Sequence, residues 1–98
     1  MSYWIHPDAE AELGDAAQYY VEQASASIAL SFLAEFERVM ELLVENQQSG
    51  PHDGNGLRIY HFERCPYSVF YEEDFVGGPQ VYAVAHQRRE PHYWQARV

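Results

Sequence analysis

The side chains with the clearest chemical potential lie in one segment, AVAHQRREPHYW at residues 83–94. It brings guanidinium, imidazole, phenol and indole groups together directly after an apolar run. Guanidinium groups bind carboxylates and phosphates through paired hydrogen bonds, and arginine, tyrosine and tryptophan are enriched at the centres of protein interfaces. The segment therefore predicts a surface that contacts another macromolecule. The candidate target-binding residues here are Arg88, Arg89, His92, Tyr93 and Trp94.

Three roles are open to this segment. Cleavage of RNA through its own 2′-hydroxyl needs a general base, a general acid and a cation, for which His86, Arg88 and Tyr93 are the candidates. A protein-binding surface uses the same arginines and rings without any proton transfer. A structural role is the third, because aromatic side chains near a chain end often anchor the tail. In that case Tyr93 and Trp94 pack on the sheet, and Arg88 and Arg89 pair with surface acids.

Other potentially reactive side chains give weaker signals. Arg58 begins a predicted strand, and its guanidinium can reach the same surface or form an ordinary ion pair. Cys65 has only Arg64 nearby to lower the pKa of its thiol, so we expect no nucleophilic role. His86 ends an apolar run and is expected to be a structural histidine. The histidines and Cys65 lack the close ligand pairs of metal sites, so no metal and no cofactor is predicted.

Length and composition restrict the class of protein. The chain has 98 residues, of which 47% are hydrophobic, so we expect a single domain over residues 1–98 with one main core. No stretch reaches the roughly eighteen apolar residues that a membrane helix needs, and the first residues do not resemble a signal peptide. The single cysteine is also unlike a small secreted domain. We therefore expect a cytoplasmic protein.

The charge is distributed unevenly along the chain. Residues 1–56 contain ten acids and one base, whereas residues 57–98 contain five of each, and the formal net charge is −9. The chain contains no lysine, so every fixed positive charge is a guanidinium. Binding to nucleic acid over the whole surface is disfavoured, because it depends on neutralising phosphates with many cations.

Two helices are predicted in the first half. Pro7 favours a helix start, and apolar residues recur at helical spacing until about Gln23. Residues 25–48 continue with helical periodicity and a wide apolar face, on which Phe32, Phe36, Val39 and Leu43 form one stripe. The side chains expected to face solvent on this second helix are Glu35, Glu37, Arg38, Glu41 and Glu45.

The second half of the chain is predicted to form strands. The runs 57–62, 67–73 and 80–86 are rich in β-branched and aromatic residues, and the turns between them have hairpin length. Antiparallel pairing of these runs follows. The stretch SYWIH at residues 2–6 predicts one further short strand at the N-terminus.

This order of elements predicts an α+β fold. An N-terminal strand is followed by a two-helix antiparallel hairpin packed on one face of a small, mainly antiparallel sheet (β-α-α-β-β-β), with a short C-terminal tail. The helices cover one face because only that arrangement buries the apolar stripe against the sheet. We expect the opposite face to remain open, with the tail from Gln87 beside it.

Four stretches in order resemble the RelE/ParE superfamily of toxins of type II toxin–antitoxin systems, over roughly residues 5–95. They are AEAELGDAAQYY at 9–20, AEFERVMELLVENQQSGP at 34–51, CPYSVFY at 65–71 and VYAVAHQRREPHYW at 81–94. The last stretch is the most specific and looks like the ParE-like, plasmid stabilisation branch. The resemblance implies a toxin that a cognate antitoxin holds inactive in a hetero-oligomer.

The resemblance also implies possible targets. ParE-like members poison DNA gyrase, which makes them inhibitors rather than enzymes, whereas RelE-like members are endoribonucleases that cleave messenger RNA on the ribosome. Where RelE-like ribonucleases carry an arginine on the middle strand of the hairpin, this chain offers Ser68. That departure, together with the missing lysines and the acidic surface, favours a protein target. A non-toxic relative that only binds its antitoxin remains a third reading.

The acidity itself suggests how the antitoxin binds. Toxins of this superfamily are usually neutral to basic, so an acidic member predicts an unusually basic antitoxin. It would dock along the acidic helical pair, and the candidate antitoxin-binding residues are Glu35, Glu41 and Glu45.

Overall fold

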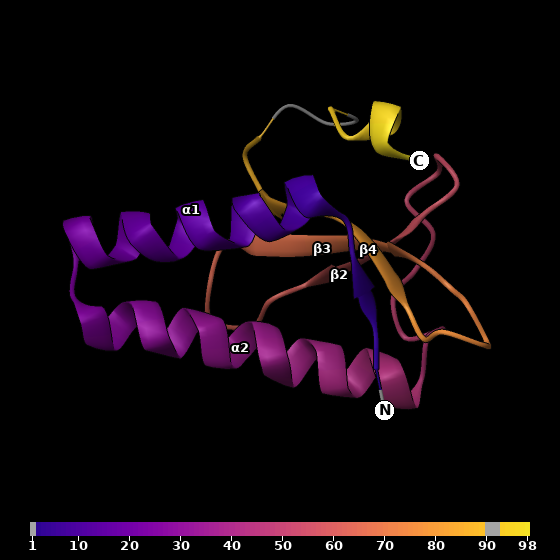
Figure 1. The fold of residues 1–98 in the computed structure, drawn as a ribbon, viewed down its shortest axis with the longest axis horizontal. Coiled ribbons are helices and arrows are strands. Elements are labelled where there is room, and N and C mark those ends of the chain that lie inside the picture. Colours follow the sequence, from indigo (N-terminus) through magenta and orange to yellow (C-terminus); the bar gives the residue numbers. More distant parts are fainter. Residues whose placement is uncertain (1, 90–92) are drawn as a thin grey trace.

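The computed structural model describes residues 2–89 and 93–98. The first half forms two helices, α1 (Pro7–Gln23) and α2 (Ala26–Glu45), which lie side by side in Figure 1. Pro7 opens α1 as predicted, and the side chain of Ser25 caps α2 by accepting a hydrogen bond from the Ile28 amide at 3.1 Å. The predicted end of the first helix is confirmed, while the second ends at Glu45, three residues before the predicted limit.

The sheet has four strands in the order β1-β4-β3-β2. Their bounds are β1 Trp4–Ile5, β2 Arg58–His61, β3 Tyr67–Glu72 and β4 Gln80–His86. The pairs β2–β3 and β3–β4 are antiparallel, and the two-residue β1 pairs parallel to β4. A short 3-10 helix, η1 (Gln95–Arg97), ends the tail. The α+β fold with its N-terminal strand, helical hairpin and mainly antiparallel sheet is confirmed.

The main core lies between the helices and one face of the sheet. The predicted stripe of Phe32, Phe36, Val39 and Leu43 is fully buried there. From β3 it meets alternate residues, because successive strand side chains point to opposite faces, whereas on β4 a register shift opposite Phe70 and Tyr71 interrupts the alternation. The strand residues in this core include Val69, Tyr71, Val81 and Val84.

The opposite face of the sheet is partly covered, and the expectation that it stays open was wrong. The tail returns across it and buries Trp94, which is 1% exposed, together with Leu57 and Ala83. The indole ring lies 5.3 Å from the ring of Phe70 on β3. Strand alternation leaves apolar side chains on this face, and a nearby indole removes them from water.

Among the residues that the structure describes, neither helix combines the length and the apolar character that a membrane span requires.

Candidate functional site

The candidate target-binding segment begins where β4 ends, and a hydrogen-bonded turn fixes its direction. The Arg89 amide donates to the His86 carbonyl at 2.9 Å, and the Arg88 amide donates to His86 Nδ1 at 3.1 Å. The Gln87 amide also donates to the Pro66 carbonyl in the β2–β3 turn. The His86 ring therefore accepts a backbone hydrogen bond, which is consistent with the structural role expected from the sequence.

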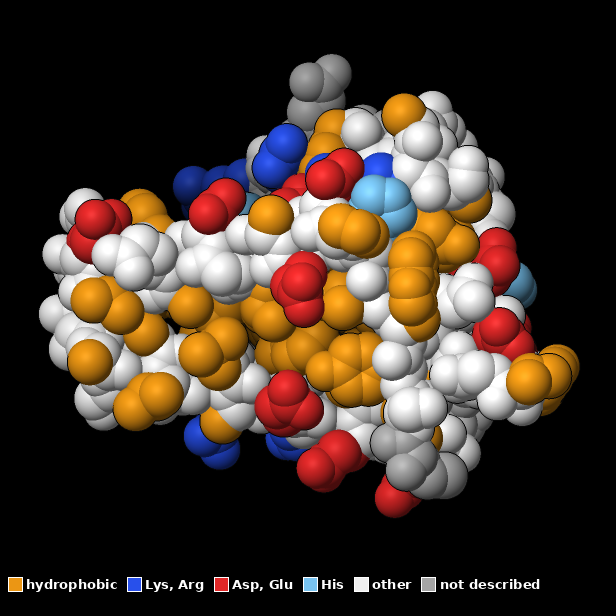
Figure 2. Space-filling model, viewed as in Figure 1, with side chains coloured by type: hydrophobic (Ala, Val, Ile, Leu, Met, Phe, Trp, Pro, Cys, Tyr) orange, Lys and Arg blue, Asp and Glu red, His pale blue; other side chains and the backbone are white. Residues whose placement is uncertain are grey.

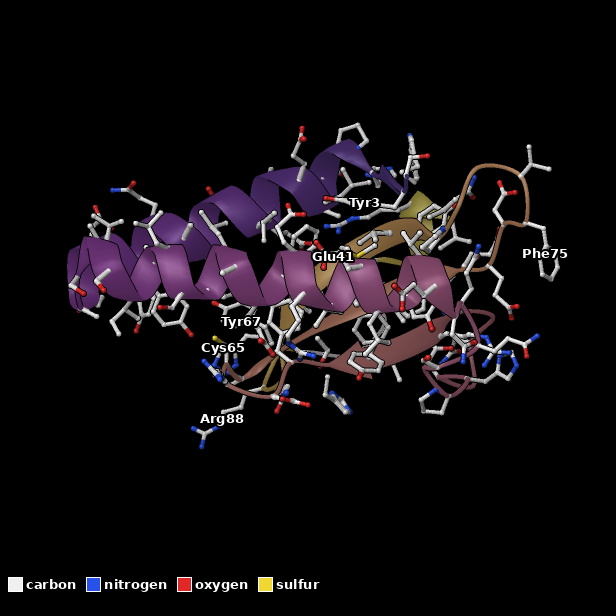
Figure 3. All side chains as sticks on the ribbon, turned by 90° about the horizontal axis from the view of Figure 1, so that it is seen from below. Tyr3, Glu41, Cys65, Tyr67, Phe75 and Arg88 are labelled. Atoms are coloured by element: carbon white, nitrogen blue, oxygen red, sulfur yellow. The ribbon has the colours of Figure 1, made fainter. Side chains whose placement is uncertain are left out.

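The two arginines of this turn differ in their surroundings. Arg88 is exposed and points away from the molecule, and it forms no ion pair within residues 2–89 and 93–98 (Figure 3). The guanidinium carbon of Arg89 lies 3.7 Å from the centre of the Tyr93 ring, and its Nη1 lies 3.6 Å from a carboxylate oxygen of Glu12 on α1. Arg88 is thus available to a partner, whereas Arg89 is held by a cation–π contact and an ion pair.

Tyr93 is half-buried in a cluster that ties the tail to α1. Arg97 donates to Glu12 at 2.8 and 3.2 Å and to the Tyr82 carbonyl at 3.0 Å. Burial raises the pKa of Tyr93 well above its usual range, and the neighbouring Glu12 carboxylate raises this pKa further. A tyrosine is already protonated at neutral pH, and the raised pKa of Tyr93 makes its phenol a weaker acid than an ordinary one.

A small cleft of about 130 Å³ lies between the tail and the second face of the sheet. His61 on β2 and Ser68 on β3 form a cross-strand pair in it, with His61 Nδ1 2.6 Å from Ser68 Oγ. The cleft is also lined by His86, Arg89, Tyr93 and Trp94. The sequence analysis did not assign His61 or Ser68 to the site. Alternation along β2 puts Ile59 and His61 on the same face, but only the register of β2 against β3 identifies Ser68 as the partner of His61.

Trp94 lines this cleft but is almost completely buried, so it does not serve as an exposed contact. Of the roles considered for it, the structural one matches its packing against Leu57 and Ala83. His92, another predicted contact, lies outside the described residues.

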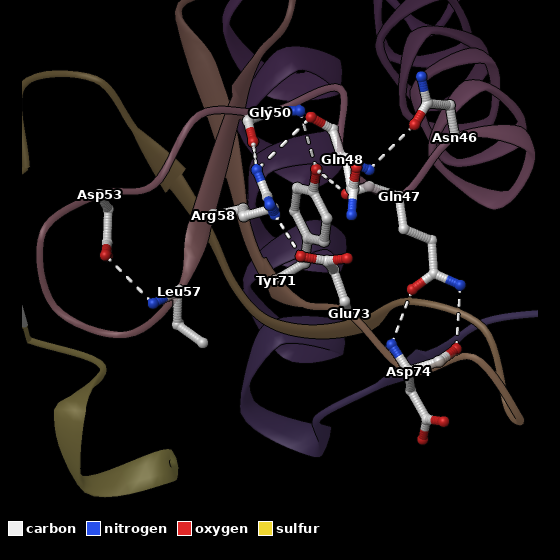
Figure 4. A network of polar contacts seen from close by, with 10 residues as sticks. All are labelled: Asn46, Gln47, Gln48, Gly50, Asp53, Leu57, Arg58, Tyr71, Glu73 and Asp74. Carbon is white, nitrogen blue, oxygen red and sulfur yellow. Dashed lines mark hydrogen bonds and ion pairs between the residues drawn. The ribbon is translucent and has the colours of Figure 1, made fainter.

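Arg58 is not among the residues that line the cleft. Its Nε lies 2.7 Å from Glu73 Oε1, and its Nη1 donates to the Gly50 carbonyl at 2.7 Å (Figure 4). The same network includes the buried hydroxyl of Tyr71, which donates to the Gln47 carbonyl and accepts from the Gly50 amide. Of the two roles considered for Arg58, the structure shows the ion pair, because local carboxylate and carbonyl acceptors hold its guanidinium against the segment that follows α2; its assignment to the target-binding set beside the tail does not hold.

Cys65 shows no sign of an activated thiol. It is half-buried, and burial raises the pKa of its thiol, as does the nearby charge of Glu35. A thiolate is therefore scarce at neutral pH. Within the part of the chain that the structure describes, histidine, cysteine and carboxylate side chains form no group of three or more suited to a metal ion.

A second hollow, the helix groove, lies along the C-terminal half of α2 and measures about 370 Å³. Its apolar lining comes from Tyr3, Met40 and Val44, and its acidic lining from Glu37, Glu41 and Glu45. Figure 2 shows hydrophobic side chains exposed between the two helices, with acidic side chains on both sides of them. The predicted antitoxin contacts Glu41 and Glu45 therefore share one surface.

Glu35 does not belong to this surface, and its predicted exposure was wrong. Its side chain is 5% exposed and accepts hydrogen bonds from Arg38 at 3.0 and 2.9 Å and from the Glu63 amide at 2.8 Å. The hydrogen bonds from Arg38 lower the pKa of Glu35 to about 2, although burial opposes that shift. Glu35 is thus a buried link between α2 and the β2–β3 turn.

Comparison with known proteins places this arrangement in a family. The sequence model of the family described as the ParE toxin of the type II toxin–antitoxin system, parDE, matches residues 3–91. A solved structure of the chromosomal ParDE toxin–antitoxin system from P. aeruginosa contains a similar chain, with 25% sequence identity and a TM-score of 0.74. The similarity covers 88% of this chain and 95% of that one. No curated protein matches the sequence. The chain therefore belongs to the ParE toxin family of type II toxin–antitoxin systems.

Proposed function

We propose that this protein is a cytoplasmic toxin that a cognate antitoxin neutralises and that acts by binding a protein target such as DNA gyrase. The observation that carries the proposal is the turn after β4, which presents Arg88 to solvent beside the stacked pair of Arg89 and Tyr93. Arginine and tyrosine are typical interface anchors, and a hydrogen-bonded turn limits the entropy lost when they are engaged.

The antitoxin would dock elsewhere, in the helix groove. Glu41 and Glu45 lie there beside apolar side chains, an arrangement that suits a basic, amphipathic partner. The structural neighbour from the ParDE system of P. aeruginosa supports an antitoxin partner. If the target and the antitoxin bind separate surfaces of the toxin, the bound antitoxin would inhibit it by blocking the approach of the target or by altering the shape of the target-binding surface.

The ribonuclease alternative has one observation in its favour. The cleft brings His61, His86 and Arg89 together, which are groups that RNA cleavage uses for proton transfer and phosphate binding. In that mechanism Tyr93 would serve as a proton donor, against which its raised pKa counts, because it makes the phenol a weaker acid. A non-toxic relative that retains only antitoxin binding is the third possibility.

Substitution of Arg88 by alanine tests the target surface. We expect the Arg88→Ala variant to bind its target about tenfold more weakly or worse, and cells that express it without antitoxin to survive in greater numbers. Arg64→Ala is the matched control, since Arg64 is another exposed arginine outside the proposed target-binding set. Equal toxicity of Arg88→Ala and the unmodified protein would show that this surface does not bind the target.

Tyr93→Phe separates the protein-binding and ribonuclease proposals. It removes only the hydroxyl and keeps the ring on which Arg89 stacks. A protein-binding toxin should therefore keep its potency, whereas a ribonuclease that uses this phenol should lose about 10²–10⁴-fold in rate. Cleaved messages in cells that express the unmodified protein, and intact messages with Tyr93→Phe, would favour the ribonuclease.

A further inference from the structure

The turn between β3 and β4 exposes two neighbouring apolar side chains at its tip. Phe75 is 89% exposed and Val76 is 98% exposed, more than any other large apolar side chain in the described ranges 2–89 and 93–98. Figure 3 shows Phe75 projecting beyond the C-terminal end of α2. Turn tips are normally polar, because apolar groups there gain nothing from burial in the fold. These two side chains are unexplained by the packing of the chain itself.

The turn is held rigidly by Asp74. One carboxylate oxygen accepts hydrogen bonds from the amides of Val76 and Gly77 at 2.9 and 3.2 Å, and the other accepts from the Gln80 side chain at 3.0 Å. The Asp74 carbonyl accepts from the Gly78 amide at 3.0 Å. Phe75 and Val76 therefore extend from a fixed support, and a partner that buries them does not have to order the turn first.

A second set of contacts fixes the turn to the end of α2. The side-chain amide of Gln47 donates to the Asp74 carbonyl at 2.9 Å, and its oxygen accepts from the Asp74 amide at 2.7 Å (Figure 4). Gly78 has a φ of +82°, and a side chain there would collide with the Ser2 carbonyl. The backbone of the turn therefore packs closely against the backbone of the N-terminal segment. The turn and α2 thus form one rigid surface.

This turn continues the apolar floor of the helix groove. Val44 lines the groove and also lines two further hollows, of about 240 and 390 Å³, that contact Phe75. Apolar surface therefore extends from Tyr3 through Val44 to the tip of the turn. The combined apolar surface is therefore longer than that of the groove or of the turn alone.

The groove is bordered by a row of like charges. Glu37, Glu41 and Glu45 are exposed and follow each other at intervals of four residues, which places them on one side of α2. None of the three forms an ion pair with a described residue. Like charges at this spacing repel each other, and a cationic partner would remove that repulsion.

We propose that the helix groove and the Phe75–Val76 turn together form one docking surface for a cationic, amphipathic helix of the antitoxin. Its apolar face would cover Tyr3, Val44 and Phe75, and its lysines or arginines would face the row of glutamates. This inference rests on the proposed function and specifies the chemistry of the partner segment.

The apolar part of the proposal is tested with a double variant, Phe75→Ser with Val76→Ser, whose side chains are too exposed to affect folding. The probe is the purified product of the open reading frame adjacent to the gene of this chain. Calorimetry should show at least about a tenfold loss of affinity. The matched control is Ile28→Ser with Leu30→Ser, an exposed apolar pair on the first turns of α2, for which the affinity should change by less than about twofold.

The charged part is tested by the dependence of affinity on salt. Replacing Glu37, Glu41 and Glu45 by glutamine should weaken binding at low salt and flatten the dependence on ionic strength. A control triple variant removes three exposed acids outside the groove and should leave that dependence unchanged. Its substitutions are Asp15→Asn, Glu22→Gln and Glu72→Gln.

The outcomes separate this inference from the function on which it rests. If the unmodified protein binds the probe and the Phe75, Val76 variant binds equally well, the docking surface is wrong while antitoxin binding stands. Loss of toxicity with unchanged affinity would assign the turn to the target, and loss of a dimer of the isolated chain would assign it to a second copy; either result overturns the inference. If the unmodified protein does not bind the probe, the proposed function fails and the inference fails with it.

Discussion

Replacement of Trp94 by alanine should lower the free energy of unfolding by about 3–5 kcal/mol. The indole is 1% exposed and packs against Leu57, Ala83 and Phe70, so truncation removes a large buried surface and leaves a cavity. A loss of that size is a large fraction of the roughly 5–15 kcal/mol that stabilises a typical domain. Urea denaturation at neutral pH measures it directly from the shift of the transition midpoint.

The matched control for this substitution is Gln95→Ala, which changes the next residue but removes an exposed side chain. We expect it to alter the free energy of unfolding by less than about 0.5 kcal/mol. If Trp94→Ala were as mild as this control, the tail would not be packed on the sheet. The arrangement of Tyr93 and Arg89 at the cleft would then lose its support.

Glu35→Gln should be the second largest perturbation, and its effect should depend on pH. The folded-state pKa of Glu35 is about 2, below the 4.5 of an ordinary glutamate, so the unfolded chain takes up the proton first as the pH falls. The stabilisation is therefore complete above about pH 4.5 and is lost as the pH falls toward 2. Because Arg38 is 40% exposed and screened by water, we expect about 2 kcal/mol rather than the full value of the shift.

The measurement for Glu35 is the free energy of unfolding of both proteins from pH 7 down to pH 3. The difference between them should be largest at neutral pH and should shrink as the solution becomes more acidic. Glu41→Gln is the control, because Glu41 is exposed on the same helix and forms no ion pair with a described residue. A difference for Glu35→Gln that stayed constant over this range would contradict the ionised, hydrogen-bonded state of the carboxylate.

Much of the fold could be predicted because local pattern and packing agree. The apolar stripe through Phe32, Phe36 and Val39 defines a helix face, and that face meets a sheet in the structure as the pattern indicates. The three later strands were predicted within one residue of their observed limits. The residues near each other in the sequence specify these helices and strands, so they can be predicted without knowing the contacts between distant parts of the chain.

The errors concern residues whose surroundings come from distant parts of the chain. Glu35 was expected in solvent, but the turn after β2 supplies the Glu63 amide that makes its burial favourable. The sequence left Arg58 open between the surface beside the tail and an ion pair, and Glu73 and the Gly50 carbonyl, which no local pattern reveals, bind its guanidinium. Helical and strand periodicity identify a face, whereas they do not reveal which polar groups the tertiary structure brings to it.

The candidate site was predicted in part. The segment after β4 does bring Arg88, Arg89 and Tyr93 to one region, as its composition indicated. The sequence could not separate Arg88, which forms no ion pair with a described residue, from Arg89, which is also exposed but pairs with Glu12 on α1. That ion pair joins residues far apart in the sequence and depends on how the tail crosses the sheet.

The most direct test of the account compares colony formation when this chain is expressed alone and when it is expressed with the product of the adjacent open reading frame. We expect expression alone to stop division with DNA damage, and co-expression to restore growth through a stable complex of the two proteins. Normal growth of cells that express the chain alone, or arrest that the second protein does not relieve, would contradict the account.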